Sequence, residues 1–273
     1  MYIISAVLEN EQSRVALYDK EYNLILKKSG ECADLAKLCL DAASEGGIKA
    51  ADVDYIGIAI DGSACPCCVA ADVEKATGIK CNAAPLIGAR ALGEAYVADD
   101  EASLIMLKID DTVDCGIVID RKIYAGANHL GGKIAHMVID FDGYECTCGR
   151  KGCFEAYASN SGFRRIVAEA GIADAESMTP VKLYAMNTPA AEEAKKLYVE
   201  YLTSGITTVI NLFQPHELVL EGPFTEVGDA IMAPMMEIIL REQYSHGMPN
   251  KCNIRFSNTE ADTALIGAAL LGR

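Results

Sequence analysis

The first part of the chain consists of short apolar runs separated by polar residues, which predicts a β-rich beginning. Residues 2–8 (YIISAVL) and 13–19 (SRVALYD) are rich in β-formers and flank a polar stretch, and residues 22–27 (YNLILK) favour a third strand. We expect two or three antiparallel strands here. The almost unbroken apolar run at residues 54–60 (DYIGIAI) predicts a strand whose sheet is covered on both faces.

Helical periodicity dominates much of the remaining chain. Apolar side chains recur at the spacing of one helix face in residues 31–45 and again over the longer stretch 188–213, where Thr188 is a candidate N-cap. The same reasoning predicts helices at residues 86–97, 162–171, 181–187, 226–245 and 260–272, strands at residues 103–109, 115–119, 217–220 and 252–257, and a hairpin continuing through residues 121–126. No internal repeat interrupts this order.

Composition and charge limit the class of protein. At 273 residues the chain can bury a sizeable core, as one large domain or two lobes. Its 24 basic and 39 acidic residues give a net charge of −15, which repels nucleic acid and anionic membranes, so we expect neither as a direct partner. The chain shows no signal peptide and no apolar run long enough to span a bilayer, so we expect a cytoplasmic protein with reduced thiols.

Residues 126–159 carry the densest cluster of chemically distinctive side chains. His136, Cys146, Cys148 and Cys153 lie there, with nine, one and four residues between successive members. Three thiols and one imidazole are the ligand set of a closed tetrahedral zinc site, and such clusters in reducing compartments usually bind metal. The alternative is a group of free buried cysteines beside an unrelated histidine. We predict structural zinc.

Glycines and further cysteines surround this pattern. Gly143, Gly149 and Gly152 punctuate the same segment, which suits a chain that folds tightly back on a metal. A second group of cysteines follows the strand at residues 54–60 but lacks a spaced second pair or a histidine; its members are Cys65, Cys67 and Cys68. We interpret these three as packing or incidental thiols, with a second metal site or a redox pair as the alternatives.

The pattern H-x9-C-x-C-G-x-x-G-C-x-E, followed by A-x-A-S, resembles the zinc segment of the ROK family (repressor, open reading frame, kinase). That family contains sugar kinases and sugar-responsive repressors. The resemblance implies that the histidine and the three cysteines bind zinc and brace a sugar pocket. It also implies that His136 and Glu155 contact the sugar, whereas the family's third contact, a glutamate, is replaced by Lys133.

The resemblance extends in order over nearly the whole chain and implies a fold. We expect an α/β, two-lobed actin-like ATPase (ribonuclease H-like) fold with a zinc-binding insertion. Residues 1–101 would form an N-terminal lobe, with the terminal helix, residues 260–273, packing back on it. Residues 102–259 would form the C-terminal lobe and contain the zinc knot, residues 136–153. Family members usually form dimers or tetramers, so we expect a homo-oligomer, without the winged helix-turn-helix of ROK repressors.

Two glycine-rich turns that cradle the nucleotide phosphates in ROK kinases are altered. The first reads VLENE here and puts Glu9 and Glu11 where phosphates would approach. The second reads DDTVDCG, residues 110–116, and only Gly116 survives. Its aspartates would repel an anion, and we interpret the segment as a solvated acidic turn, with an Mg²⁺ or Ca²⁺ site as the alternative.

Two more family positions differ. Alignment on A-L-G-E puts the family's Asn-Asp pair, whose aspartate is the general base for the sugar hydroxyl, at Pro85 and Leu86. A leucine cannot accept a proton, and loss of a general base costs about 10² to 10⁴ in rate. In the element that approaches the adenosine, Gly222 is kept as the cofactor-contact residue while Glu221 replaces the other glycine. These losses argue against binding of ATP with Mg²⁺.

Three hypotheses follow from the retained scaffold and the altered motifs. The first is a pseudokinase with structural zinc that binds a carbohydrate or a protein partner, and Lys133 suggests an anionic sugar unless it is simply a surface lysine. The second is an active ATP-dependent sugar or N-acyl-sugar kinase with a rewired site. The third is a structural or assembly protein. Phosphoryl transfer rests on positioning and charge stabilisation, and the altered motifs are the ones that would supply both. We therefore adopt the first hypothesis. The spare carboxylates for the second are Asp61, Asp110, Asp111 and Asp114.

Overall fold

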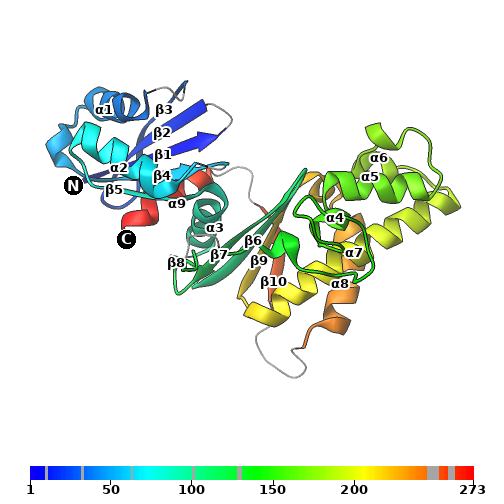
Figure 1. Cartoon of the computed structure of the whole chain (residues 1–273). Coiled ribbons are helices and arrows are strands. Elements are labelled where there is room, and N and C mark those ends of the chain that lie inside the picture. Colours follow the sequence, from blue (N-terminus) through cyan, green and yellow to red (C-terminus); the bar gives the residue numbers. More distant parts are fainter. Residues whose placement is uncertain are drawn as a thin grey trace. The chain divides into compact units, whose positions relative to one another are not determined.

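Two five-stranded β-sheets organise the computed structural model of this chain (Figure 1). The structure describes residues 1–9, 12–31, 34–62, 64–99, 102–127, 131–244, 252–257 and 262–273. By their contacts the residues form two compact units: unit 1 is Met1–Leu104, Gly116–Ala125 and Asn258–Arg273, and unit 2 is Ile105–Cys115 and Gly126–Ser257. Residues 122–123 contact helix α3 (Leu86–Val97) of unit 1, and the expected lobe limits stay a prediction.

The sheet of unit 1 has the strand order β3-β2-β1-β4-β5. Its strands are β1 (Tyr2–Glu9), β2 (Gln12–Asp19), β3 (Leu24–Glu31), β4 (Val53–Ile60) and β5 (Cys81–Pro85). The first three strands pair antiparallel, while β4 pairs parallel with both β1 and β5. The three predicted N-terminal strands and the buried strand at residues 54–60 are therefore confirmed.

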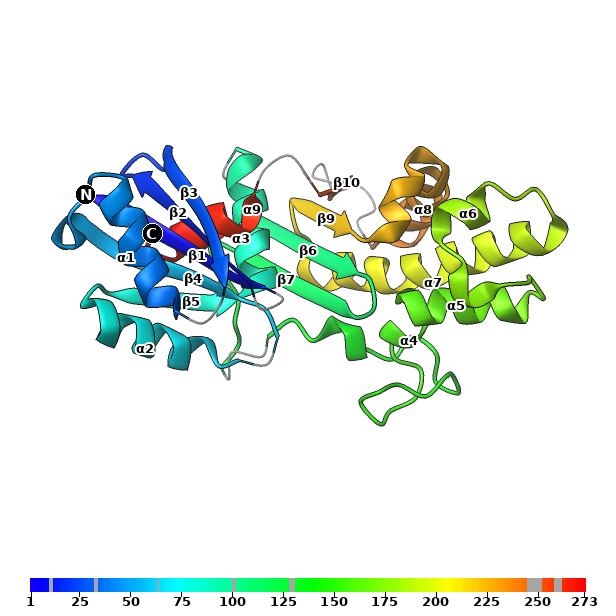
Figure 2. The same ribbon diagram turned by 90° about the horizontal axis from the view of Figure 1, so that it is seen from above.

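Helices cover both faces of this sheet, because successive side chains of a strand point to opposite faces. Ile4 packs in one cluster with side chains of α1 (Leu35–Glu45) and α2 (Pro66–Thr77). Ile3 and Val7 pack in a second cluster with side chains of α3 and of α9 (Thr263–Ala269). Figure 2 shows α9, drawn in red from the C-terminal end of the chain, beside the blue strands of the N-terminal end.

Small residues let α3 and α9 approach each other closely. A Cβ atom at Gly93 of α3 would collide with the carbonyl oxygen of Thr263, and one at Gly267 of α9 would collide with the carbonyl oxygen of Ala89. The two helices therefore meet backbone to backbone, which only glycine permits at these positions. The terminal helix thus packs on unit 1 through its small-residue face.

The second sheet has the order β10-β9-β6-β7-β8. Its strands are β6 (Ser103–Ile109), β7 (Val113–Ile119), β8 (Lys122–Ile123), β9 (Glu217–Glu221) and β10 (Asn253–Phe256). The helices of unit 2 are α4 (Glu155–Ala158), α5 (Asn160–Glu169), α6 (Pro180–Tyr184), α7 (Pro189–Phe213) and α8 (Asp229–Glu242). Thr188 is the N-cap of α7, and its hydroxyl accepts a hydrogen bond from the Ala191 N–H at 3.2 Å. No helix in the described ranges combines the length and the apolar character needed to cross a membrane.

Several elements differ from the sequence-based expectations. The sequence predicts no element at residues 66–77 or 81–85, where the structure has α2 and β5. The helix expected from residue 31 begins only at Leu35, because Asp34 caps it by accepting from the Lys37 N–H at 2.9 Å. Two other predicted helices also have different limits. The helix α8 begins at Asp229, and α9 begins at Thr263 and is followed by a 3₁₀ turn. Residues 245, 260 and 261 of these predicted helices lie outside the described residues.

Candidate metal centre and ligand site

The four predicted metal ligands converge in unit 2. One donor atom from each of His136, Cys146, Cys148 and Cys153 lies within 4.8 Å of each of the others. Nδ1 of His136 is 3.6 Å from Sγ of Cys146, and Sγ of Cys148 is 3.6 Å from Sγ of Cys153. Two sulfurs on one zinc ion, each bonded at about 2.3 Å, lie within about 4.6 Å of each other. This cluster can hold a metal ion, and its donors are those that zinc prefers.

The backbone of the knot is held by hydrogen bonds and by close approaches at glycine. The Ile139 N–H donates to the carbonyl oxygen of Gly152 at 2.8 Å. Gly152 has φ +71°, and a Cβ atom there would collide with the carbonyl oxygen of Asp140. A Cβ atom at Gly143 would likewise collide with the hydroxyl of Tyr157. Any larger residue at these two positions would force the turns apart and displace the ligands.

Aromatic side chains fasten the knot to the long helix α7. Phe154, which directly follows the last cysteine, is fully buried, and its ring occupies the space that a side chain at Gly205 of α7 would need. The hydroxyl of Tyr198 of α7 donates to the carbonyl oxygen of Ala158 at 3.1 Å. The position of the sulfur ligands is therefore fixed by packing as well as by any bound metal.

The cysteine thiols of the knot differ in acidity. Burial raises the pKa of Cys153 to about 12, so its thiol is protonated at neutral pH when no metal is bound. A hydrogen bond from the backbone N–H of Arg150 lowers the pKa of Cys148. Zinc binds the thiolate form, so an arriving ion must displace the Cys153 proton.

The expected sugar-binding residues lie in or next to this knot in the sequence. Glu155 is the first residue of α4; its Oε2 accepts a hydrogen bond from the Val113 N–H at 3.0 Å and its Oε1 accepts one from the Thr147 hydroxyl at 3.4 Å. His136 is half-buried at the end of a 3₁₀ turn, and exposed Lys133 caps the start of that turn. The structure thus brings all three into the neighbourhood of the knot, whereas their contact with a sugar stays a prediction.

The acidic turn between β6 and β7 consists of carboxylates that each have their own partner. Asp110 forms an ion pair with Nζ of Lys108 at 3.0 Å, and Asp111 accepts a hydrogen bond from Nδ2 of Asn160 at 2.9 Å. Asp114 accepts one from a threonine hydroxyl of the same turn at 3.2 Å. Within the described ranges these aspartates do not form a group of donors close enough to share an ion. The geometry favours a solvated acidic turn.

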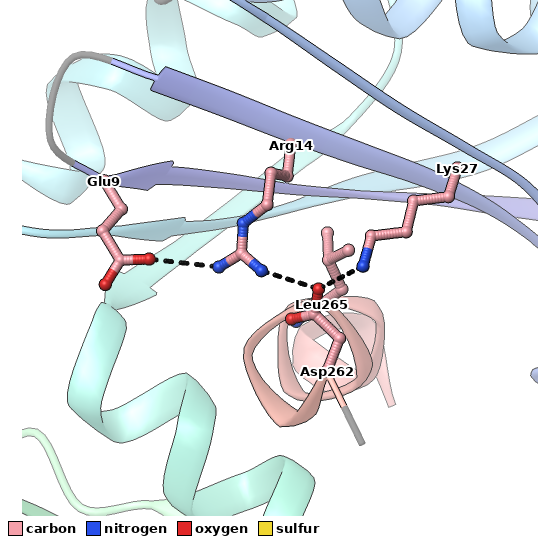
Figure 3. A network of polar contacts seen from close by, with 5 residues as sticks. All are labelled: Glu9, Arg14, Lys27, Asp262 and Leu265. Carbon is pink, nitrogen blue, oxygen red and sulfur yellow. Dashed lines mark hydrogen bonds and ion pairs between the residues drawn. The ribbon is translucent and has the colours of Figure 1, made fainter. Parts of the chain in front are cut away.

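The hairpin of β1 and β2 carries a network of ion pairs in unit 1 (Figure 3). Arg14 lies between two acids, 3.1 Å from a carboxylate oxygen of Glu9 and 2.7 Å from Oδ2 of Asp262, which also pairs with Nζ of Lys27 at 2.6 Å. Two acidic and two basic groups thus neutralise each other beside the start of α9. Glu11, the other carboxylate of this hairpin, lies outside the described residues.

The start of α3 contains no group that could act as a base. Pro85 is its N-cap residue with no side-chain hydrogen bond, and no acidic residue lies in the first turn. Leu86 is only 6% exposed and belongs to the core between the sheet and α9. In unit 2, Gly222 has φ +146°, and a Cβ atom there would collide with the carbonyl oxygen of Ile109, so packing alone requires this glycine. Its contact with a cofactor stays a prediction.

The second cysteine group does not pack in the core. Cys65, Cys67 and Cys68 are all exposed, and their sulfur atoms lie within 4.8 Å of one another. Sγ of Cys65 is 2.9 Å from Sγ of Cys67, and hydrogen bonds with the thiols of Cys67 and Cys68 lower the pKa of Cys65 to about 7. These residues are therefore not packing thiols, because they lie exposed at the N-terminus of α2, and the other part of the interpretation, incidental thiols, stays a prediction.

Sequence comparisons relate the chain to both repressors and kinases. The xylose repressor of Bacillus subtilis (strain 168) is 26% identical over 148 residues, which are 54% of this chain and 38% of the repressor. The glucokinase of Halalkalibacterium halodurans is 28% identical over 164 residues, which are 54% of this chain and 50% of the glucokinase. The chain thus matches half or less of the length of these two relatives. Because a repressor is among them, the expectation that nucleic acid is not a partner stays an untested prediction.

Structural comparison establishes the fold. The ROK hexokinase from Thermus thermophilus superposes with a TM-score of 0.83 at 22% identity, over 99% of this chain and 98% of the hexokinase. The predicted α/β, actin-like ATPase fold is therefore confirmed. The ROK family model matches residues 65–273, well over half of the chain. The chain therefore belongs to the ROK family.

Proposed function

We propose that this chain is a catalytically inactive ROK protein, a pseudokinase that folds around structural zinc and binds a carbohydrate or a protein partner. The observation that carries this proposal is the start of α3. The position that the family resemblance assigns to the general base is the buried Leu86, and no acidic residue lies in the first turn of the helix. A missing general base alone costs about 10² to 10⁴ in rate.

Both turns that would hold nucleotide phosphates support the same conclusion. A phosphate cradle needs open backbone N–H groups and unpaired positive charge. At the first hairpin the cations of Arg14 and Lys27 are already paired with acids. At the second turn only Gly116 of the family's glycines is kept, and the three aspartates of the turn add negative charge. The described residues of both turns therefore support the proposal that a triphosphate is not bound.

The metal in this proposal has a structural role. His136, Cys146, Cys148 and Cys153 would hold zinc with four protein ligands, which leaves no open position for a reacting water or substrate. Such an ion supplies folding free energy by joining the 3₁₀ turn before the knot to the residues that precede α4. The backbone hydrogen bonds and the close contacts at glycine in the knot then orient Glu155 and His136.

A carbohydrate site next to the knot is the proposed binding function. Since Nδ1 of His136 faces the sulfur of Cys146, its Nε2 is left to donate to a ligand hydroxyl. The carboxylate of Glu155 is held in place by two hydrogen bonds and can accept from a second hydroxyl. The exposed ammonium of Lys133 favours an anionic ligand, such as a sugar acid or a sugar phosphate.

The test of inactivity is a calorimetric titration of Mg·ATP into zinc-loaded protein, followed by a kinase assay with neutral and acidic sugars. We expect no heat up to millimolar nucleotide and no turnover above background. An active ROK glucokinase assayed in parallel provides the positive control. Micromolar ATP binding or measurable turnover would replace the pseudokinase with the active, rewired kinase. In that case Asp→Asn variants of Asp61, Asp110, Asp111 and Asp114 locate the base, and unchanged turnover in all four removes that route.

The test of ligand class is a competition experiment with the variant Lys133→Gln. If the lysine selects an anionic sugar, the wild-type protein binds acidic sugars more tightly than neutral ones, and the variant loses this preference by about the 1 kcal/mol typical of an exposed charge pair. Lys151→Gln, which removes a different exposed lysine of the knot, is the matched control and should keep the preference. An equal preference in the wild type and in Lys133→Gln would show that Lys133 is a surface lysine that does not select the ligand.

A further inference from the structure

The cysteines at the start of α2 form a compact group of sulfur atoms in unit 1. All three sulfurs, from Cys65, Cys67 and Cys68, lie within 4.8 Å of one another, and all three side chains are exposed. In the described part of the chain, two groups of side chains could hold a metal ion: the knot and these three cysteines. None of the residues assigned to kinase, sugar or zinc binding in the ROK family belongs to it.

The helix start explains why these sulfurs meet. Cys65 is the N-cap of α2, and its carbonyl oxygen accepts hydrogen bonds from the N–H groups of Cys68 at 3.1 Å and Val69 at 3.2 Å. Pro66 occupies the first helical position, where its fixed φ suits the helix and its missing N–H costs nothing. The first turn of α2 is therefore a rigid frame that directs three thiols to one small region.

The chemistry of this group favours a soft metal ion. Backbone N–H groups at a helix N-terminus stabilise negative charge, and thiols placed there ionise more readily. Soft thiolate ligands favour Cu(I), zinc and iron–sulfur clusters over hard metal ions. A structural zinc site needs four protein ligands, whereas the described residues provide no fourth histidine, cysteine or carboxylate within this group. Three sulfurs without a fourth donor fit Cu(I) better than zinc.

We propose that Cys65, Cys67 and Cys68 form a second metal site, which binds one Cu(I) ion through three thiolates. Each thiol that becomes a ligand releases its proton to solvent, and no oxidation state changes. Sγ of Cys65 and Sγ of Cys67, 2.9 Å apart, must separate to share the ion, and rotation of the exposed side chains permits this. The site is independent of the pseudokinase proposal, since it uses none of the same residues.

The experiment is an anaerobic titration of Cu(I) into the full-length, zinc-loaded protein in competition with bicinchoninate, with protein-bound zinc measured at each step. We expect the wild type to take one Cu(I) per chain without losing zinc. The variant Cys67→Ser should weaken Cu(I) binding at least about 10-fold, the loss that even an outer-shell change produces at metal sites. Cys252→Ser, which removes a cysteine outside both groups, should bind Cu(I) like the wild type.

Three outcomes would overturn the proposal. One is Cu(I) binding by Cys67→Ser that equals wild-type binding. Another is release of zinc in step with copper uptake, which would assign the copper to the knot. The third is failure of the wild type to compete while mass spectrometry shows the loss of two hydrogens between Cys65 and Cys67, which would identify a redox pair. Because Cys67 is exposed, its replacement should leave the melting curve unchanged, and Cys68→Ser provides an independent second variant.

Discussion

Tyr157 is the residue on which the turns of the knot converge. Its hydroxyl donates to Oδ2 of Asp140 at 2.8 Å and accepts from the Tyr144 N–H at 3.0 Å. Tyr157 is 1% exposed, and it makes both hydrogen bonds to half-buried partners. This one hydroxyl therefore joins the two sides of the loop that carries the ligands.

Removing that hydroxyl should destabilise the fold. We expect Tyr157→Phe to lower the free energy of unfolding by about 1–3 kcal/mol, because it leaves a backbone N–H and a carboxylate without a partner. Urea unfolding of wild type and variant measures the difference. Tyr124→Phe, at a side chain that is 50% exposed, is the control and should change stability by less than about 0.5 kcal/mol. Similar effects of both variants would contradict this role.

Loss of the metal should cost more than loss of a hydrogen bond. Chelation of zinc, or Cys148→Ser, is expected to lower the free energy of unfolding by several kcal/mol, because metal binding is coupled to folding. Thermal melting with zinc content measured in parallel tests this. Cys252→Ser controls for the removal of a thiol. A melting curve that does not change after verified zinc removal would show that the site is not structural.

The convergence of the four candidate metal ligands could be predicted from sequence, but their supporting residues could not. His136 and the three cysteines share a residue chemistry and spacing that rarely occur together without a metal. Tyr157 and Asp140 carry no such signal, since they meet only where Gly143 and Gly152 let the chain approach closely. Their roles depend on contacts that exist only after folding.

At the scale of elements, local sequence failed where tertiary packing decides. The helix α2 buries only Ala70 and Val73, so its apolar periodicity is weak, although Pro66 and the left-handed Gly78 mark its two ends. The strand β5 has the sequence CNAAP, whose alanine, asparagine and proline are poor strand formers, and it exists because it pairs with β4. The strongly patterned α7 and β4, in contrast, were predicted nearly to the residue.

The contact between α3 and α9 should tolerate no side chain. We expect Gly267→Ala to lower the free energy of unfolding by about 1–3 kcal/mol, because the added Cβ collides with the carbonyl oxygen of Ala89 and forces the helices apart. Chemical denaturation measures the loss. Gly30→Ala is the matched control, since its Cβ would meet only the Leu38 side chain at 3.4 Å. A stable Gly267→Ala protein would mean that α9 can shift without cost.

At the scale of the whole molecule, the fold followed from the family resemblance rather than from the pattern of elements. Strands and helices alternate in many α/β proteins, and only the motifs around His136, Leu92 and Leu265 indicated which one. Activity was harder to predict, because a family fold persists when its chemistry changes. The altered positions, more than the retained ones, therefore carry the functional argument.

The expected homo-oligomer is a prediction at this scale. Leu212 at the end of α7 is 70% exposed, Leu240 near the end of α8 is 46% exposed and Tyr244, which follows α8, is 85% exposed. These exposures suit a surface that another copy covers. Light scattering should give a multiple of the 29.2 kDa chain mass. Leu212→Asp should shift the protein toward monomer, while Val181→Asp, at another exposed apolar residue, should not. A monomeric wild type that binds a small molecule would exclude a purely structural role.

The packing of α9 on β1 has a consequence for the way a cell makes this protein. Arg14 and Asp262, which form an ion pair, are 248 positions apart, so Arg14 leaves the ribosome long before Asp262 is made. Until α9 is made, the apolar face around Ile3 and Val7 has no helix to cover it, and the nascent chain is exposed to aggregation. A stop codon at position 262 would therefore leave unit 1 without α9, and the apolar face around Ile3 and Val7 would stay uncovered.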